Sequence, residues 1–365
     1  MSDSLSKPQI IPHLSEDAGV TLFDCLWVPC SPRFVVTGTK PTGEGLIRVY
    51  SMGAKELTVL GEASTSHAVK CGTFGHSSLE ERHLATGDFS GSLCTWDLEK
   101  LSEPVTRINK AHDDFINAID GFGGLGNAGG GKGAPEIATA SKDGTVKVWD
   151  PRVKDRAVAC VKPAEGQKSR DAWSVAFGNC HGAGDRMLAA GYDNGDIKLF
   201  DLKAMKVSWE TTLPNGVCSL QFDRNDIEMN KMLATCLEGR FHVWDMRTRH
   251  EKKGYAGLDS KLEHSTATIW KGRHLPQNRD VFALAGGSGE VSLWQYEYPD
   301  KRFSVDDESG EKEGVVGKVV KLQEGQIGDQ PVASFSWSPD KAGLGLCVSF
   351  DQKVTIVIVT KLNTL

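Results

Sequence analysis

Several features that would assign this 365-residue chain to particular classes of protein are missing from it. No apolar run approaches the roughly 18 to 20 residues that a membrane helix needs, and residues 1–12 lack the basic and apolar segments of a secretory signal. The nine cysteines form no CxxC pair, and an odd number without framework spacing is typical of a reducing compartment. We therefore expect a cytoplasmic protein without a membrane segment.

Clustered positive charge is also missing. The net charge is −6, and no stripe of Lys and Arg is visible along the sequence. Because binding to phosphates requires clustered cations, we expect no nucleic-acid partner. The contents of 39% hydrophobic and 25% charged residues are typical of a folded globular protein.

The motifs that could carry chemistry are incomplete. Residues 126–133 approach a phosphate-binding loop, but the Ser or Thr that would hold Mg²⁺ is missing and a strand is expected to follow. Cys180 and His181, with Asp185 nearby, are too few for a metal site without a second cluster. The Gly-x-Ser-x-Gly motif of a hydrolase does not occur. We expect no catalytic residue, cofactor or metal, and an enzyme that assembles its site from separate loops stays open as a minor alternative.

What the chain does contain is a repeat, in which a glycine, four intervening residues and a large ring recur roughly every 50 residues. The six complete copies are Gly45 with Tyr50, Gly91 with Trp96, Gly144 with Trp149, Gly195 with Phe200, Gly239 with Trp244, and Gly289 with Trp294. A seventh, degenerate copy has Gln352 in place of the glycine and Val357 in place of the ring. Recurrence of one short motif at this interval predicts a repeat architecture.

The third copy indicates which architecture. Residues 137–150 alternate apolar and polar side chains on both sides of an Asp-Gly turn, which is a strong hairpin signal. Candidate strands at 115–119 and 157–161 flank this hairpin, so one repeat supplies four strands. Because the other copies are in register with it, we predict an all-β, seven-bladed β-propeller. The expected blades are 15–62, 63–109, 110–163, 164–213, 214–262, 263–323, and 324–365 with 7–14, with a charged, mobile loop at 300–314.

This third copy resembles the WD-repeat family closely. In that family the turn Asp belongs to a buried chain of hydrogen bonds with an upstream His, a Ser or Thr of the second strand and the Trp. The matching residues here are His112, Thr139, Asp143 and Trp149. A satisfied network of this kind rigidifies a blade. Copies five and six lack the turn Asp, so other contacts must hold their hairpins.

The two ends of the chain are expected to meet. The seventh copy ends at its third strand, 354–359, and has no fourth strand after it. The segment 7–11 precedes the first blade and has no other evident partner. We predict that it pairs with the last blade and closes the ring, because closure removes an exposed sheet edge.

Binding is expected at the rim of the central channel, where turns meet. Large or charged side chains in these turns are informative because the turns do not require them, and aromatic residues and Arg are the usual hot-spot types. The candidate residues are Phe89, Phe115, Lys142, Arg170, Trp173, Tyr192, Leu237 and Phe350. The alternative is that several of them fold inward over the edge of the channel. As a group they favour a protein partner over a ligand recognised by charge.

Two copies of Trp-Asp-x-Arg, ending at Arg152 and Arg247, stand out. In some propellers this motif docks the protein onto the adaptor of a cullin-type ubiquitin ligase, so a substrate receptor of such a ligase is the alternative function. The simpler interpretation is that each Arg caps or pairs with the Asp before it.

Longer phrases narrow the resemblance. They are KPQII from Lys7, KCGTFG from Lys70, NAIDG from Asn117, GTVKVWDPR from Gly144, AGYDNGDIKLFDL from Ala190, NGVCSL from Asn215, HLPQNR from His274 and IVTKLN from Ile358. These phrases resemble the Monad-type WD-repeat proteins, a family of axonemal dynein assembly factors. The resemblance implies a noncatalytic cytoplasmic adaptor, a monomer within a larger complex. Its implied partners are the RuvB-like ATPases, their scaffold subunit, prefoldin-like subunits and dynein heavy chains as clients. A role in apoptosis is also attached to the family.

Overall fold

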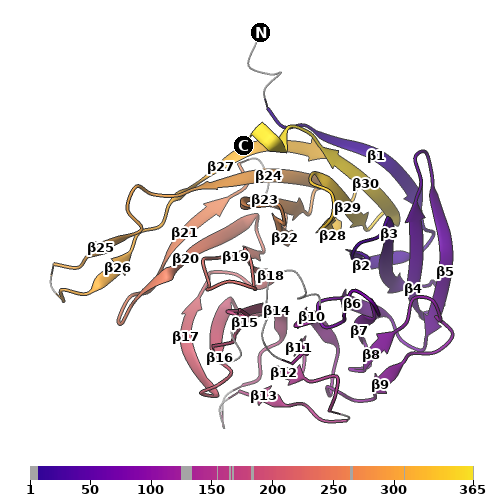
Figure 1. Cartoon of the computed structure of the whole chain (residues 1–365), viewed down its shortest axis with the longest axis horizontal. Helices are drawn as coiled ribbons and strands as arrows, with labels where there is room; N and C mark the ends of the chain where they lie inside the picture. Colours follow the sequence, from indigo (N-terminus) through magenta and orange to yellow (C-terminus); the bar gives the residue numbers. More distant parts are fainter. Residues whose placement is uncertain are drawn as a thin grey trace.

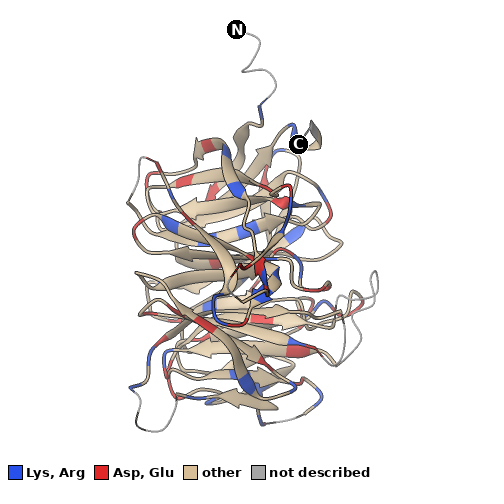
Figure 2. Ribbon diagram, turned by 90° about the vertical axis from the view of Figure 1, so that its left-hand side faces the viewer, with Lys and Arg blue, Asp and Glu red and all other residues tan. Residues whose placement is uncertain are grey.

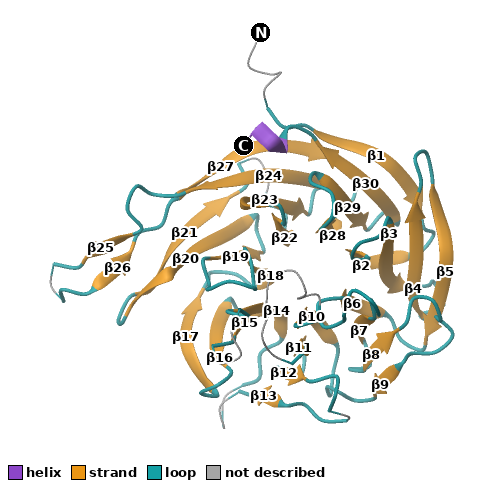
Figure 3. Ribbon diagram, viewed as in Figure 1, coloured by secondary structure: helices purple, strands orange, loops and turns teal. Residues whose placement is uncertain are grey.

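The computed structural model describes residues 7–124, 134–153, 155–163, 166, 168–181, 185–263, 266–307 and 309–364. Seven four-stranded antiparallel sheets are arranged around a central axis, each sheet forming one blade of a propeller (Figure 1). Strands account for nearly all the regular structure, and a short helical segment, η3 (Leu362–Thr364), lies beside the last blade (Figure 3). The all-β, seven-bladed propeller predicted from the repeat is confirmed.

The strands of the blades follow one another along the chain, from the channel outward. Blade one contains β2 (Thr21–Trp27), β3 (Arg33–Thr39), β4 (Gly45–Met52) and β5 (Leu57–Thr65). Blade two contains β6 (Val69–Thr73), β7 (Leu84–Asp88), β8 (Leu93–Trp96) and β9 (Thr106–Ile108). Blade three contains β10 (Ile116–Phe122), β11 (Glu136–Ser141), β12 (Val146–Trp149) and β13 (Ala159–Val161). Blade four contains β14 (Ala172–Gly178), β15 (Met187–Tyr192), β16 (Asp196–Asp201) and β17 (Lys206–Thr212).

The remaining three blades keep this order, except that blade six contains an insertion and blade seven takes its fourth strand from elsewhere in the chain. Blade five contains β18 (Val217–Phe222), β19 (Lys231–Cys236), β20 (Arg240–His250) and β21 (Gly254–Lys261). Blade six contains β22 (Ile269–Leu275), β23 (Asn278–Gly286), β24 (Glu290–Glu297) and, after an inserted hairpin, β27 (Lys318–Gln326). Blade seven contains β28 (Val332–Trp337), β29 (Leu344–Ser349) and β30 (Lys353–Val359), and its fourth strand comes from the other end of the chain.

That fourth strand is β1 (Ile10–Asp17), which pairs antiparallel with β30 from Ile10 opposite Val359 to Asp17 opposite Lys353 (Figure 1). The predicted closure of the ring by the N-terminal segment is therefore confirmed. The pairing reaches further along the chain than the expected segment 7–14, so blade one begins at Thr21 and not at residue 15. Leu14 explains the extension, because its side chain packs against the buried residues shared by blades one and seven.

The hydrophobic core is divided among the interfaces between blades. Seven clusters of buried apolar residues occur in the described part of the chain, and each is drawn from two neighbouring blades. Leu22 of blade one, for example, belongs to one cluster with Leu346 of blade seven. A single blade therefore cannot bury its own faces, and the ring is stable only when every blade has both neighbours.

The glycine of the repeat is required by its backbone. Gly195 has a φ of +92°, and a Cβ at this position would lie 2.1 Å from the carbonyl oxygen of Leu213. A side chain is excluded by both the left-handed conformation and the close approach of the next blade's entry segment. In the degenerate seventh copy, Gln352 adopts the same left-handed region with a φ of 66°.

The segment 300–314, expected as a loop, contains a short hairpin of β25 (Phe303–Val305) paired with β26 (Lys312–Gly314) (Figure 1). Its acidic residues contact the neighbouring blade. The Lys253 ammonium, beside the β20–β21 turn, lies 2.6 Å from the Asp306 carboxylate and 2.7 Å from that of Glu313. These charges therefore dock the insertion onto blade five. Apart from this docking, residues of both signs are interspersed over the side of the disc (Figure 2).

No helix among the described residues is long and apolar enough to cross a membrane.

Candidate functional site

The buried hydrogen-bond chain of blade three holds one side of the rim in place. Trp149 Nε1–H donates to Thr139 Oγ1 at 2.8 Å, and Thr139 Oγ1 lies 2.7 Å from His112 Nε2. His112 Nδ1 lies 3.0 Å from Asp143 Oδ2. Since Asp143 can only accept, Nδ1 carries the proton and Nε2 accepts from the threonine hydroxyl. Hydrogen bonds thus connect all four side chains predicted from the sequence, from Trp149 on β12 to Asp143 in the β11–β12 turn.

The turn carboxylate of this chain is ionised. Partial burial raises the pKa of Asp143, but hydrogen bonds from His112 and Thr145 outweigh burial and hold this pKa well below its usual range. The carboxylate also accepts from the backbone N–H groups of Thr145 and Asp113. The turn that carries Lys142 is therefore rigid, which is useful for a binding surface because less conformational entropy is lost on association.

One recurring backbone hydrogen bond defines the rim position in blades two to five and in blade seven. The residue at the turn between the second and third strands donates its backbone N–H to the carbonyl just before the first strand. This bond joins Phe89 to Ala68 at 3.0 Å, Lys142 to Phe115 at 2.9 Å, Leu237 to Gly216 at 3.3 Å, and Phe350 to Pro331 at 3.0 Å. Five of the eight predicted rim residues are therefore members of such pairs on one face of the disc.

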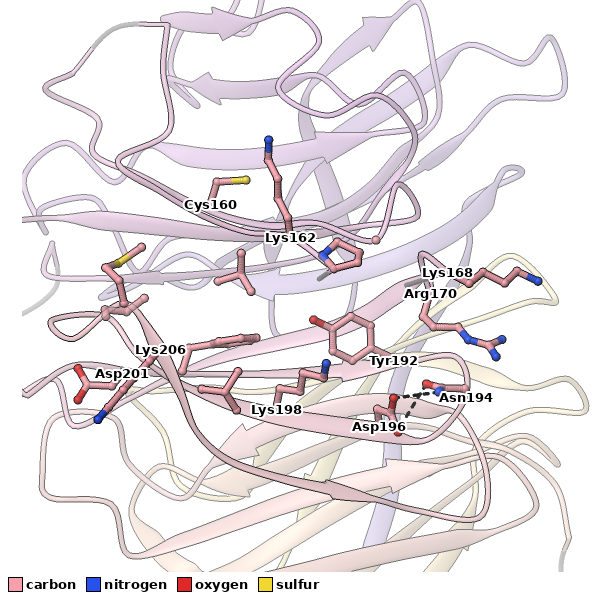
Figure 4. A pocket seen from close by; sticks show the side chains of 17 residues that line it. Cys160, Lys162, Lys168, Arg170, Tyr192, Asn194, Asp196, Lys198, Asp201 and Lys206 are labelled. Carbon is pink, nitrogen blue, oxygen red and sulfur yellow. Dashed lines mark hydrogen bonds between the residues drawn. The ribbon is translucent and has the colours of Figure 1, made fainter. Parts of the chain in front are cut away.

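Blade four departs from the expectation at this position. The bond here joins Asp193 to Asp171 at 3.0 Å, so the rim position belongs to Asp193 and not to Tyr192. Tyr192 is the last residue of β15 and is only 7% exposed. Its ring points into a groove between blades three and four, together with Arg170 (Figure 4). Alternation along a strand explains the difference, because moving one residue reverses the side to which a side chain points.

Part of the rim is an aromatic arc, which we define as Phe23, Phe89 and Phe115. The ring centroids of Phe23 and Phe89 are 5.5 Å apart, and those of Phe89 and Phe115 are 4.5 Å apart, both stacked. Ammonium groups lie over the two ends, Lys70 at 4.9 Å from the Phe23 centroid and Lys142 at 4.8 Å from that of Phe115. The arc thus joins blades one, two and three in a partly exposed apolar surface edged by positive charge.

A second aromatic pair lies across blades six and seven. The rings of Trp270 and Phe350 meet edge to face with centroids 5.9 Å apart, and Phe350 is 39% exposed. Aromatic surface held by its neighbours but open to solvent is the usual chemistry of an interaction hot spot.

The inner strands share a feature that brings further residues to the channel. Each of the seven inner strands has a shift in register near its start, and the extra residue points into the channel. The seven bulged residues are Phe23, Lys70, Asn117, Trp173, Cys218, Trp270 and Ala333. All seven line a cavity of about 350 Å³, which Leu237 also lines.

Of these bulged residues, the sequence predicted only Trp173. A signal was nevertheless present, because in most inner strands the bulge follows a buried aliphatic residue, as in Val69-Lys70 and Val217-Cys218. Aligning the sequences of the seven inner strands at this buried aliphatic residue would have shown that the next position varies most in size and charge. Variation at a position that does not serve the core indicates a role in binding.

Three cations line the cavity: Lys70, which is one of the bulged residues, and Lys271 and Arg273 of β22. Burial lowers the pKa of each of these groups. Lys271 Nζ lies 3.8 Å from Asp24 Oδ1, and that carboxylate already accepts hydrogen bonds from Ser334 Oγ at 2.6 Å and the Cys25 N–H at 3.0 Å. The channel mouth is therefore positive on balance.

Comparison with known proteins assigns this propeller to a family. The family model described as WD domain, G-beta repeat matches residues 103–150, which include the hydrogen-bond chain of blade three. Dynein axonemal assembly factor 10 of Xenopus tropicalis is 54% identical over 365 residues, 100% of each chain. The proteins of this name from Homo sapiens and Chlamydomonas reinhardtii are 54% and 50% identical, each over 99% of both chains. The chain belongs to the dynein axonemal assembly factor 10 family.

The two Trp-Asp-x-Arg motifs of this family member differ in their contacts. Arg152 forms a forked pair with Asp150, with Nη2 to Oδ2 at 2.7 Å and Nε to Oδ1 at 3.0 Å. Arg247 instead pairs with Glu228, because Asp245 is occupied by Arg302 Nε at 2.7 Å. Side-chain pairing with the preceding Asp therefore describes Arg152, whereas Arg247 contacts Asp245 through its backbone N–H, at 2.9 Å.

The described residues contain no group of three or more His, Cys, Asp or Glu that could hold a metal. Cys180 is fully buried among the apolar residues shared by blades three and four. The Asn179 side chain accepts the Met229 N–H of blade five at 2.7 Å, so both residues serve the packing between blades. Burial raises the pKa of the channel thiols Cys71 and Cys218 to about 12, so both stay protonated. The glycine-rich stretch 126–133 lies outside the described residues.

Proposed function

We propose that this chain is a noncatalytic protein adaptor in the assembly of axonemal dynein arms. The observation that carries the proposal is the full-length identity of 50–54% to proteins named dynein axonemal assembly factor 10 from animals and a green alga. A rigid disc with an exposed aromatic surface supports a role in binding.

The finer proposal concerns partners and place. We place the action in the cytoplasm, before the arms enter the cilium. The partners are the RuvB-like ATPases with their scaffold subunit, prefoldin-like subunits, and dynein heavy chains as clients. The aromatic arc, the Trp270–Phe350 pair and the positive channel mouth lie on one face, so one partner can contact all three. Stacked rings lose little side-chain entropy on binding, which suits them as anchors.

The test uses a ciliated cell that lacks the protein and is supplied with variants of the full chain. Loss of the protein is expected to leave cells viable, with dynein heavy chains depleted from the cytosol and arms missing from axonemes in electron micrographs. Normal arms in the null cell would overturn the proposed function itself.

The rim is tested separately by Phe89→Ala with Phe115→Ala, which removes two rings of the arc. A matched control is Val59→Ala with Leu60→Ala on the outer strand of blade one, where the side chains are 45% and 54% exposed. The control is expected to restore the arms and the arc variant is not, at equal melting temperature. Lys142→Glu gives a second arc variant that keeps the rings. Full rescue by both arc variants would show that partners bind elsewhere.

A further inference from the structure

A groove of about 640 Å³ runs along the side of the disc between blades three and four (Figure 4). Its origin is a difference in strand length. The outer strand of blade three, β13, has three residues, whereas its counterpart in blade four, β17, has seven. The short β13 leaves part of the facing side of β16 uncovered, so Lys198 and Phe200 line the groove.

The groove collects positive charge from both blades. Five cationic side chains line it: Lys162, Lys168, Arg170, Lys198 and Lys206. Within the described residues none of these five forms an ion pair with a carboxylate. This concentration is the reverse of the whole chain, whose net charge is −6.

The two carboxylates of the groove are occupied by neutral donors. Asp196 accepts from Thr212 Oγ1 at 2.7 Å and from Asn194 Nδ2 at 2.9 Å. Asp201 accepts the backbone N–H groups of the following turn at 2.9 and 2.8 Å. The cations are therefore free to interact with a partner.

Apolar side chains form the floor between these charges. Tyr192 and Phe200 present ring faces while being 7% and 4% exposed, and Met205 and Val207 are 56% and 43% exposed. The Lys198 ammonium lies 5.9 Å from the centroid of the Tyr192 ring, in the middle of the groove (Figure 4). An occupant must therefore satisfy positive charge along its sides and cover apolar surface beneath.

We propose that this groove binds an extended acidic peptide segment of a partner protein, with apolar side chains alternating with its carboxylates. Alternate residues of an extended chain point to opposite sides, so one set can meet the floor while the other meets the lysines. The groove follows β16, whose six residues span about 20 Å, which is the length of about six extended residues.

The distribution of the cations favours a peptide over a phosphate group. Lys168 and Arg170 lie at one end of the groove and Lys206 at the other (Figure 4). A single phosphate would need donors that converge on one point, whereas carboxylates along a strand match separated charges. The negative charge of the whole chain also opposes a nucleic acid. This site is separate from the aromatic arc, so its failure would leave the proposed adaptor role standing.

The experiment measures binding of the full chain to a fluorescein-labelled peptide of alternating glutamate and leucine by fluorescence anisotropy. The groove variant is Lys198→Glu with Lys206→Glu. The matched control, Lys55→Glu with Lys100→Glu, makes the same change in net charge at two exposed lysines of blades one and two. Thermal melting checks that both variants are folded.

The unaltered chain and the control variant are expected to bind with similar affinity, and the groove variant at least about tenfold more weakly. Affinity should fall as salt is raised, because the charges are exposed. Equal weakening in both variants would show charge attraction without a site and overturn the proposal. The proposal would also be overturned if the unaltered chain did not bind the peptide, or if a peptide with lysine in place of glutamate bound equally well. Tighter binding of a single-stranded oligonucleotide at this groove would overturn it as well.

Discussion

Replacing Thr139 with valine tests the hydrogen-bond chain of blade three. The side chain is 0% exposed, and valine has nearly the same shape, so no cavity is created. The change removes the acceptor of the Trp149 N–H and the donor to His112 Nε2. Each buried polar group left without a partner costs about 1–3 kcal/mol. Two such groups cost about 2–6 kcal/mol together, and one buried methyl group returns about 0.8 kcal/mol. We therefore expect Thr139→Val to lower the free energy of unfolding by about 1–5 kcal/mol.

The same substitution in two other blades supplies graded controls. In blade two, Thr86 Oγ1 accepts a single bond, from Trp96 Nε1 at 3.0 Å. Thr86→Val leaves one polar group without a partner, and after the same methyl gain it should cost about 0–2 kcal/mol. In blade five, the Thr235 hydroxyl is fully buried and has no hydrogen-bond partner among the described residues. Thr235→Val should therefore be neutral or stabilising.

Urea unfolding, followed by far-ultraviolet circular dichroism at neutral pH, measures all three free energies. The expected order of destabilisation is Thr139→Val, then Thr86→Val, then Thr235→Val. If the three variants lost equal stability, or if Thr235→Val lost the most, the hydrogen bonds would not be the cause and the reasoning would be refuted.

Two further predictions concern closure and pH. Deleting residues 1–17 removes β1 and exposes the edge of β30, so the whole disc should melt at a lower temperature and associate with rising concentration; calorimetry showing an unchanged melting temperature would contradict this. Burial lowers the pKa of His274 to about 4, below its unfolded value of about 6.5, so the unfolded chain binds more protons between these values. His274 should therefore contribute a fall in stability of up to about 3 kcal/mol as pH drops from 6.5 to 4. The fall should be less steep in His274→Gln, which urea unfolding at stepped pH would show.

Much of the fold could be predicted because its causes are local. In five of the six complete copies the repeated glycine lies at a turn with positive φ. The ring that follows fills the interface with a neighbouring blade, so both residues recur at fixed spacing. The hydrogen-bond chain was visible for the same reason, since His112, Thr139, Asp143 and Trp149 keep their distances along one blade. Closure followed from counting strands, because a three-stranded last blade would leave an open edge.

The candidate site was only partly predictable because it depends on register. Phe89 and Phe115 were identified from their place in turns, and the structure stacks them. Tyr192 was assigned to the rim, but the turn of blade four places Asp193 there. The bulged residues were also hard to predict, because an extra residue in a strand changes the direction of one side chain without changing the hydrophobic pattern around it. Arg247 could not be assigned its partner Glu228, because Asp245 is occupied by Arg302 from an insertion of another blade.

The sequence by itself determined the number of blades, their order and the closure of the ring, since each of these follows from spacing within one repeat. Only the tertiary structure decided which side chains meet across repeats. The arc joins rings of three blades, and the groove joins cations such as Lys162 and Lys206 from two blades, so neither forms a cluster along the chain. The physical reason is that a blade folds from neighbouring residues, whereas its surfaces for binding form only when the blades pack side by side.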